Sequence, residues 1–210
     1  MKILNLYCGI GGNRKLWKNC EITAIENNPD IANCYSKLYP NDNVIIEDAH
    51  DYLLKNFENF DFIWSSPPCT SHSQFRQNMC VNRKKSPPMF IDMKLYQEIL
   101  FLKHNFDGYW VVENVKPYYK TLIDPSFEME RHLFWSNFNV SQYTPPKTEI
   151  NIIKRGTKED LQKKHGIDLA SFNLTNKRKI LRNCVNPLVG KHLLQRVLKL
   201  KNPAASYEVS

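Results

Sequence analysis

The chain has 210 residues, of which 42% are hydrophobic and 24% are charged, and its net charge is +8. These values are ordinary for a globular protein and fit one domain, or one domain with a small insertion. The apolar residues after Lys2 are interrupted at Asn5 and again in the glycine-rich residues 9–12, so they fall short of a signal peptide or a membrane span. We therefore expect a cytoplasmic protein with no membrane partner.

The cysteines show no pattern that is typical of a metal site or a disulfide framework. No Cys-x-x-Cys pair occurs, and no histidine cluster lies near any cysteine. The six are Cys8, Cys20, Cys34, Cys69, Cys80 and Cys184. We therefore predict no bound metal.

Short apolar runs alternate with segments of helical period along most of the chain. In chain order, we expect a strand at residues 3–7, a helix at 13–18, a strand at 21–25, a helix at 29–39, a strand at 44–46, a helix at 49–56, a strand at 61–64, a mobile loop at 70–88, a helix at 92–106, a strand at 108–112, an antiparallel edge pair at 131–135 and 138–143, and helices at 158–165 and 187–199. This alternation predicts an α/β fold with a doubly wound, mostly parallel sheet.

The first strand leads into a glycine turn, Cys8-Gly9-Ile10-Gly11-Gly12, which holds three of the chain's seven glycines. A strand, a glycine turn and a helix let backbone N–H groups approach a ligand. The turn has neither the Walker pattern nor the full Gly-x-Gly-x-x-Gly, so alone it is a weak indicator of a phosphate or dinucleotide site.

Acidic residues follow the next two expected strands, Glu26 after the second and Glu47-Asp48 after the third. A carboxylate in the position of Glu26 can accept hydrogen bonds from ribose hydroxyls. The alternative is a surface glutamate near a helix start, but the preceding glycine turn favours the ribose.

The fourth strand stops abruptly at Ser66-Pro67-Pro68-Cys69. Because each proline fixes φ and lacks an N–H, the backbone must leave the sheet rigidly and place Cys69 beyond the strand's carboxyl end. Open α/β sheets have their ligand crevices there. A lone cysteine is more often a small core residue, so its reactivity depends on its neighbours. The fifth strand ends in Glu113-Asn114-Val115, which brings a second carboxylate to the same edge.

Positive charge is concentrated late in the chain. Residues 147–201 hold fourteen Lys and Arg against four Asp and Glu, so the remaining residues carry a net charge of −2. This asymmetry indicates a polyanion met by one part of the molecule, although a solvated basic surface is the simpler alternative.

Together these motifs resemble those of the DNA cytosine-C5 methyltransferases over nearly the whole chain. Residues 5–12 are similar to the family's first motif, Ser66-Pro67-Pro68-Cys69 to its nucleophile motif, and Glu113-Asn114-Val115 to its Glu-Asn-Val motif. Residues 182–185 are similar to its late Gly-Asn-x-Val motif. The resemblance implies a small enzyme of phage-like or restriction-associated type with the Rossmann-like fold of S-adenosylmethionine-dependent methyltransferases.

The resemblance also implies the chemistry. Cytosine C5 is a weak nucleophile, and addition of a thiolate to C6 activates it toward the methyl group of S-adenosylmethionine. Cys69 fits the role of the thiolate, and Glu113 fits that of an acid facing N3 of the base. Arg131 would contact the base and the carboxylate, although the stretch before it only partly matches the family's Gln-x-Arg-x-Arg pattern.

By the same resemblance, a larger set of residues would hold the cofactor. Tyr7 would stack near the adenine, Glu26 would bind the ribose, Asp48 would bind the adenine amino group, and Asn183 would line the pocket. The full expected set is Tyr7, Cys8, Gly9, Gly11, Gly12, Glu26, Asn27, Asp48, Ala49, Pro67, Asn183 and Val185.

Double-stranded DNA is the expected partner, and its target base must be flipped out of the stack. Gln74 and Arg76 are the candidates to close over that base, and the basic residues Lys154, Arg155, Lys177, Arg178 and Lys179 are the candidates to bind phosphates. The expected division is a catalytic and cofactor-binding domain at 1–143, a short basic target-recognition insertion at 144–182, a returning helix at 183–201 and a frayed tail at 202–210.

Three features depart from the family pattern. Asn5 replaces the usual Asp, Arg182 replaces the usual Gly, and the interval between Arg131 and Asn183 is short for a recognition domain. Target recognition is therefore minimal, relaxed or supplied by a partner. The sequence leaves two other functions open, namely the same chemistry on RNA and a catalytically silent DNA-binding module.

Overall fold

The computed structural model describes residues 1–146 and 156–202. Seven strands form one sheet in the order β3-β2-β1-β4-β5-β7-β6. The strands are β1 (Lys2–Leu6), β2 (Glu21–Ile25), β3 (Asn43–Ile45), β4 (Phe62–Ser65), β5 (Tyr109–Val115), β6 (Phe127–Met129) and β7 (His132–Ser136). The first five run parallel, and β6 and β7 add an antiparallel edge.

The strand order reverses between β1 and β4, which lie side by side with Leu6 opposite Ser65. The chain leaves β1 toward β2 and β3, and it leaves β4 toward β5. In a doubly wound sheet, this reversal opens a crevice beyond the carboxyl ends of the strands. The glycine turn after β1 and the Pro-Pro-Cys loop after β4 both lie at this edge. The predicted α/β fold is therefore confirmed.

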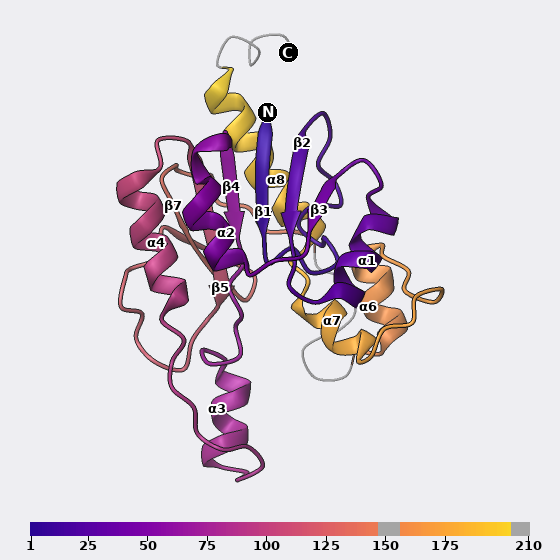
Figure 1. Ribbon diagram of the computed structural model, residues 1–210. Coiled ribbons are helices and arrows are strands. Elements are labelled where there is room, and N and C mark those ends of the chain that lie inside the picture. The colour runs from indigo at the N-terminus through magenta and orange to yellow at the C-terminus, as the bar shows by residue number, and fades with distance from the viewer. Residues whose placement is uncertain (147–155, 203–210) are drawn as a thin grey trace.

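Helices cover both faces of the sheet. The helices of the described residues are α1 (Pro29–Leu38), α2 (Ala49–Asn56), the 3-10 helix η1 (Phe57–Asn59), α3 (Gln74–Val81), α4 (Lys94–Asn105), α6 (Lys158–His165), α7 (Lys177–Asn183) and α8 (Pro187–Lys201). Figure 1 shows α2 and α4 in front of the sheet and α8 behind it.

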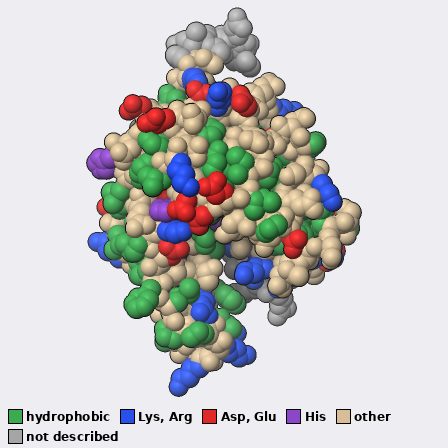
Figure 2. Space-filling model, in the orientation of Figure 1, with side chains coloured by type: hydrophobic (Ala, Val, Ile, Leu, Met, Phe, Trp, Pro, Cys, Tyr) green, Lys and Arg blue, Asp and Glu red, His purple; other side chains and the backbone are tan. Residues whose placement is uncertain are grey.

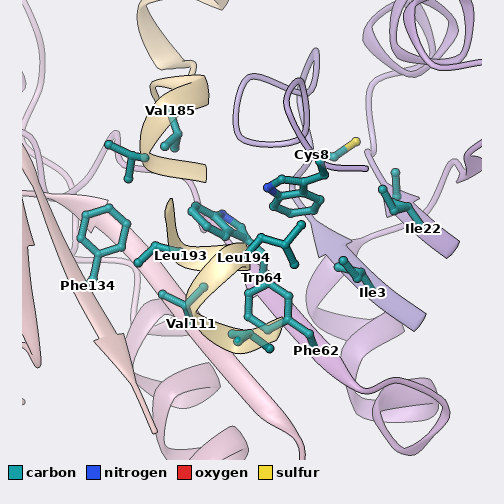
Figure 3. Close-up of a cluster of buried hydrophobic side chains, with 14 of the residues drawn as sticks. Ile3, Cys8, Ile22, Phe62, Trp64, Val111, Phe134, Val185, Leu193 and Leu194 are labelled. Atoms are coloured by element: carbon teal, nitrogen blue, oxygen red, sulfur yellow. The ribbon is translucent and has the colours of Figure 1, made fainter. Parts of the chain in front are cut away.

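The alternation of strand side chains builds two cores. On one face, Ile3, Phe62 and Trp64 pack with Leu193 and Leu194 of α8, as Figure 3 shows. On the other face, the neighbouring residues of the same strands pack against α2 and α4. Successive residues of a strand point to opposite faces, so each central strand contributes to both cores and reads as a continuous apolar run.

A third cluster joins the described part of the predicted basic insertion to the rest of the molecule. Leu161 of α6 and Leu181 of α7 are buried with Ile10 of the glycine turn and Cys34 of α1. The insertion therefore packs on the segment that follows β1. Its two helices are fixed close to the crevice.

The predicted helix at residues 13–18 is wrong. This segment forms turns, with hydrogen bonds from Lys15 to Gly12 and from Trp17 to Arg14 in place of helical ones. Six residues are too few to offset the cost of starting a helix. Tertiary contacts fix the segment instead, because Trp17 packs on Trp64 and the Asn13 carbonyl lies against Gly190 of α8.

Two short α-helices were not predicted. Residues 74–81 of the expected mobile loop form α3, whose N-cap is the Ser73 side chain, and residues 177–183 form α7. Because α3 buries none of its side chains and α7 buries only Leu181, neither sequence shows an amphipathic period.

The predicted edge pair is also wrong in its second half. The strand over residues 131–135 exists as β7, but its partners are β6 and β5. Residues 138–143 form no strand, and their apolar character reflects packing, since Phe138 belongs to the core behind the sheet. The fifth strand is longer than predicted, so Glu113 lies within β5, opposite Phe134 of β7.

The other expected elements are confirmed to within two residues at each end. In residues 1–146 and 156–202, no helix has the length and apolar character needed to cross a membrane. The predicted frayed tail lies outside the described residues, apart from Asn202.

Candidate active site

The loop that carries Cys69 is attached to the strand that carries Glu113. Asn114 is buried, and its side-chain amide donates a 2.9 Å hydrogen bond to the Pro67 carbonyl oxygen. Downstream, the Cys69 carbonyl oxygen accepts hydrogen bonds from the backbone N–H groups of His72 and Ser73. The thiol thus lies on a loop that is fixed on both sides, as the two prolines predicted.

Cys69 is half-buried, and its environment disfavours the thiolate. Burial raises the pKa of its thiol, and the nearby carboxyl group of Glu113 raises this pKa further. Arg131 and Lys179 lower it in part. The nucleophile predicted from the sequence is therefore a thiol that positive charges nearby would activate.

Glu113 is buried, and burial raises its pKa to about 7. A hydrogen bond with Ser66 and the positive charge of Arg131 oppose this shift. Near neutral pH, a large fraction of Glu113 therefore keeps its proton and can donate it.

His132 lies beside this carboxyl group, with its Nε2 3.5 Å from Glu113 Oε1. Both side chains are buried. Burial first, and the charges of Arg131 and Lys164 after it, lower the pKa of His132 to about 3. The imidazole is therefore neutral, and its contact with Glu113 is not an ion pair.

Arg131 lies in the turn between β6 and β7, where Glu130 has a positive φ of 52°. Its guanidinium donates a hydrogen bond to the backbone carbonyl of Arg182. The Arg182 guanidinium in turn lies over the ring of Phe75 in α3, 5.8 Å from the ring centre. Arg182, which departs from the family pattern, thus joins the late motif to both Arg131 and α3.

The glycine turn offers an open space beside Glu26. A Cβ atom at Gly9 would meet nothing within 4 Å, and the φ of Gly9 is 53°. The carboxylate of Glu26 accepts hydrogen bonds from the N–H groups of Gly9 (3.1 Å) and Asn28 (2.9 Å). These bonds hold it at the turn with lone pairs left for further donors. An open backbone turn with a fixed carboxylate has room and acceptors for a ribose, and the contact of Glu26 with a ribose stays a prediction.

The carboxylate of Asp48 has hydrogen-bond and ion-pair partners within the protein. It is the N-cap of α2, where it accepts hydrogen bonds from the N–H groups of His50 and Asp51, and its other oxygen lies 3.2 Å from Nζ of Lys94. It remains partly exposed. Figure 2 shows acidic side chains gathered near the middle of the visible face.

Several other predicted cofactor residues have packing contacts that account for them. A Cβ atom at Gly11 would clash with the Tyr39 ring, and one at Gly12 would clash with the Val185 carbonyl oxygen. The remaining members of the predicted set divide by exposure: Cys8, Ala49, Pro67 and Val185 are buried, and Asn27 and Asn183 are exposed.

Sequence reasoning missed three residues that hold the site together. Asn114, which bonds to Pro67, was noted only as part of a motif. Ser66 forms a hydrogen bond with Glu113. Glu98 of α4 is fully buried and accepts a 2.6 Å hydrogen bond from the Tyr7 hydroxyl. A glutamate among apolar residues of a helix is the one sequence signal that could have identified Glu98.

The predicted DNA-binding residues within the described ranges lie on two helices, α3 and α7. Gln74 and Arg76 of α3 donate hydrogen bonds to the carbonyls of Pro117 and Pro87. In Figure 2, the lower projection that contains α3 shows hydrophobic and basic side chains together. Phe90, which follows α3 in the chain, is 98% exposed.

The other basic candidates belong to α7. Lys179 is exposed, and its positive charge lowers the pKa of the Cys69 thiol. The guanidinium of Arg178 donates a hydrogen bond to the Gly156 carbonyl, and the ammonium of Lys177 donates one to the Ala170 carbonyl. Lys154 and Arg155 lie outside the described residues. Within the described ranges, no group of three or more His, Cys, Asp or Glu side chains is placed to hold a metal ion.

Comparison with known proteins identifies the family. The family model for C-5 cytosine-specific DNA methylases matches residues 1–143. The chain belongs to this family. Its cofactor is accordingly S-adenosylmethionine, which fits the open glycine turn and the fixed Glu26 carboxylate. No curated protein sequence matches the chain.

Among solved structures, the Entamoeba histolytica methyltransferase EhMeth is similar over 96% of this methylase chain and 99% of its own, at 12% identity and a TM-score of 0.58. A mutant of Spodoptera frugiperda DNMT2 is 26% identical over 58% of this chain, with a TM-score of 0.40. The match spans only 37% of the length of that insect protein. The likeness to EhMeth supports the Rossmann-like methyltransferase fold.

The buried Glu113 makes the stability of the methylase depend on pH. Because the pKa of Glu113 is raised to about 7 from 4.5, its contribution is fully present below pH 4.5 and is lost as the pH rises through 7. Glu113→Gln removes this ionisation. Relative to wild type, the variant should gain up to about 3 kcal/mol of unfolding free energy between pH 4.5 and pH 8.5. Urea unfolding at both pH values measures the difference.

Glu58→Gln is the matched control, because Glu58 is exposed in η1 at the far end of β4. Its stability relative to wild type should be the same at both pH values. If the difference in unfolding free energy between Glu113→Gln and wild type is also the same at both pH values, Glu113 has an ordinary pKa.

Proposed function

We propose that the protein is a small cytoplasmic methyltransferase that transfers a methyl group from S-adenosylmethionine to C5 of a flipped-out cytosine in DNA. The hydrogen bond between Asn114 and the Pro67 carbonyl carries this proposal, because it holds the Cys69 loop against the strand that presents Glu113. Addition to C6 of cytosine requires a thiol, and protonation of N3 requires a protonated carboxyl group. Both groups lie at the same edge of the sheet.

In the proposed reaction, the Cys69 thiolate bonds to C6 of cytosine while Glu113 donates its proton to N3. The ring electrons that are pushed toward C5 then take the methyl group, which the bound cofactor supplies as an electrophile. Loss of the C5 proton to a water molecule and cleavage of the bond between Cys69 and C6 restore the aromatic ring, and Glu113 recovers its proton from N3.

Arg131 fits a role at the base because its positive charge acts on both groups. It lowers the pKa of Cys69 and that of Glu113. Its effect favours the thiolate, which is the attacking form. The hydrogen bond to the Arg182 carbonyl fixes the arginine from the side of the late motif.

DNA is the proposed substrate because a basic stretch directly follows Cys69 in the chain and Lys179 of the basic helix α7 acts on the Cys69 thiol. Residues 70–91, which contain α3, include Arg76, Arg83, Lys84 and Lys85 and no acidic residue, and α7 adds exposed basic side chains. Such side chains neutralise phosphates and position a duplex without reading its sequence. We propose that residues 144–182 form the short target-recognition insertion and that residues 1–143 and 183–201 form the catalytic unit.

The covalent step predicts a trapped adduct. With duplex DNA that contains 5-fluorocytosine and with S-adenosylmethionine, the wild-type protein should form a complex that survives denaturing electrophoresis, because fluorine at C5 blocks release of Cys69. Cys69→Ala should form none. Cys80→Ala is the matched control, since Cys80 lies in α3 and is also half-buried, and it should form the adduct.

The same assay separates the alternatives. An adduct with 5-fluorocytosine-containing RNA and none with duplex DNA would replace DNA by RNA as the substrate. Tight DNA binding without an adduct in any sequence context would identify a silent binding module.

The basic α7 helix predicts a change in the salt dependence of DNA binding. Each phosphate contact contributes about 0.9 to the slope of log affinity against log salt. Replacing Lys177 and Lys179 by Gln should therefore lower the slope by up to about 2. Fluorescence anisotropy with a labelled duplex at several salt concentrations measures the slope.

The matched control replaces Lys103 of α4 and Lys199 of α8, both exposed, by Gln. This double variant should keep the wild-type slope. If the two double variants change the slope equally, the α7 lysines contribute no more to DNA binding than other exposed lysines.

A further inference from the structure

Glu98 has a fully buried side chain that accepts hydrogen bonds from three other elements. The Tyr7 hydroxyl lies 2.6 Å from Oε1, the Ser65 hydroxyl 2.5 Å from Oε2, and Nδ1 of His50 3.0 Å from Oε1. Burying a carboxyl group costs several kcal/mol unless donors satisfy it, and here three donors converge.

Packing alone does not call for a glutamate at this position. The neighbouring α4 residues Leu95, Ile99 and Leu102 form the apolar contact with the sheet. A leucine at position 98 would extend this contact without the cost of burying a polar group. The three hydrogen-bond donors around position 98 therefore explain why a glutamate occupies it.

Each donor belongs to a segment that carries part of the proposed cofactor site. Tyr7 leads directly into the glycine turn, Ser65 directly precedes the Ser66-Pro67 step, and His50 follows Asp48 in the first turn of α2. Tyr7 follows β1, Ser65 is the last residue of β4, and His50 lies in the helix after β3, so Glu98 connects three segments across the switch point of the sheet.

The contact with Tyr7 also stabilises an unfavourable backbone conformation. Tyr7 has a φ of 53°, in the left-handed region that side chains other than glycine rarely adopt. Such a conformation persists only where the surroundings enforce it. The hydrogen bond from the Tyr7 hydroxyl to Glu98 holds the side chain, and it thereby holds the residue that starts the turn.

We infer that Glu98 is the positioning residue of the cofactor site. It does not contact the cofactor. It holds the glycine turn, the start of α2 and the strand end before Pro67 in the arrangement that binds S-adenosylmethionine. This inference rests on the proposed function, and it adds a residue outside all the motifs that indicated that function.

Glu98→Gln tests the inference with a readout that is independent of turnover. The amide has nearly the volume of the carboxyl group, but one of its two acceptor oxygens is replaced by a donor. Binding of S-adenosylhomocysteine, measured by calorimetry at 10 °C without DNA, should weaken about tenfold or more. Affinity for duplex DNA should stay within twofold of wild type, and circular dichroism should show a folded protein.

The matched control is Glu58→Gln, which should bind S-adenosylhomocysteine like wild type. Tyr7→Phe and Ser65→Ala each remove a single donor and should each weaken binding by threefold or more, so they also test the inference if Glu98→Gln does not fold. The double variant Ser65→Ala with Glu98→Gln should bind no more weakly than Glu98→Gln alone, because the amide group that replaces Oε2 can no longer accept the Ser65 hydroxyl hydrogen.

A purely structural Glu98 would lower the melting temperature and leave the affinity at 10 °C within twofold of wild type, and that result would overturn the inference. If the single-donor variants also bind like wild type, the same conclusion holds. Failure of the wild-type protein to bind S-adenosylhomocysteine would instead refute the proposed function, and with it this inference.

Discussion

The candidate site depends on one hydrogen bond, from the side chain of Asn114 to the carbonyl oxygen of Pro67. It connects the end of β5 to the loop after β4, and so it sets the distance between the two groups that carry the proposed chemistry. The prolines make the loop stiff, but stiffness alone does not orient it. Because Asn114 is buried and also accepts the N–H of Val115, its side chain has no freedom to turn away. The Glu-Asn-Val motif thus contributes an acid and the residue that places the thiol beside it.

This arrangement is electrostatically unfavourable in the free protein. Burial raises the pKa of Glu113 and that of Cys69, and the carboxyl group raises the thiol pKa further. The compensating charges come from Arg131 and from Lys179 of the basic insertion. The groups that we propose to meet DNA therefore also act on the nucleophile. Packing of α6 and α7 onto the glycine turn keeps these helices at the site.

Much of the fold could be predicted from the sequence because the central strands are buried on both faces. Such strands are continuous apolar runs, and their helices have a clear period. The same physics explains the failures. Neither α3 nor α7 buries a stripe of side chains, residues 13–18 are fixed by tertiary contacts such as that of Trp17, and Phe138 is apolar because it fills the core.

Site residues could be predicted only where a sequence motif indicates their chemical role. Cys69 and Glu26 follow strand ends and Glu113 lies near the end of β5, each in a pattern with a chemical reason. Glu98 could not be found in this way. Its three partners come from separate parts of the chain and meet only when the sheet has formed.

The central claim is that Cys69 and Glu113 act on each other at one site. Iodoacetamide alkylation of Cys69 at pH 8, followed by peptide mass spectrometry with Cys80 as the internal reference, tests this claim most directly. Above pH 7, Glu113 is mostly charged and raises the pKa of the thiol, so Glu113→Gln should increase the thiolate fraction and accelerate alkylation of Cys69 several-fold. Equal rates in the two proteins would contradict the account.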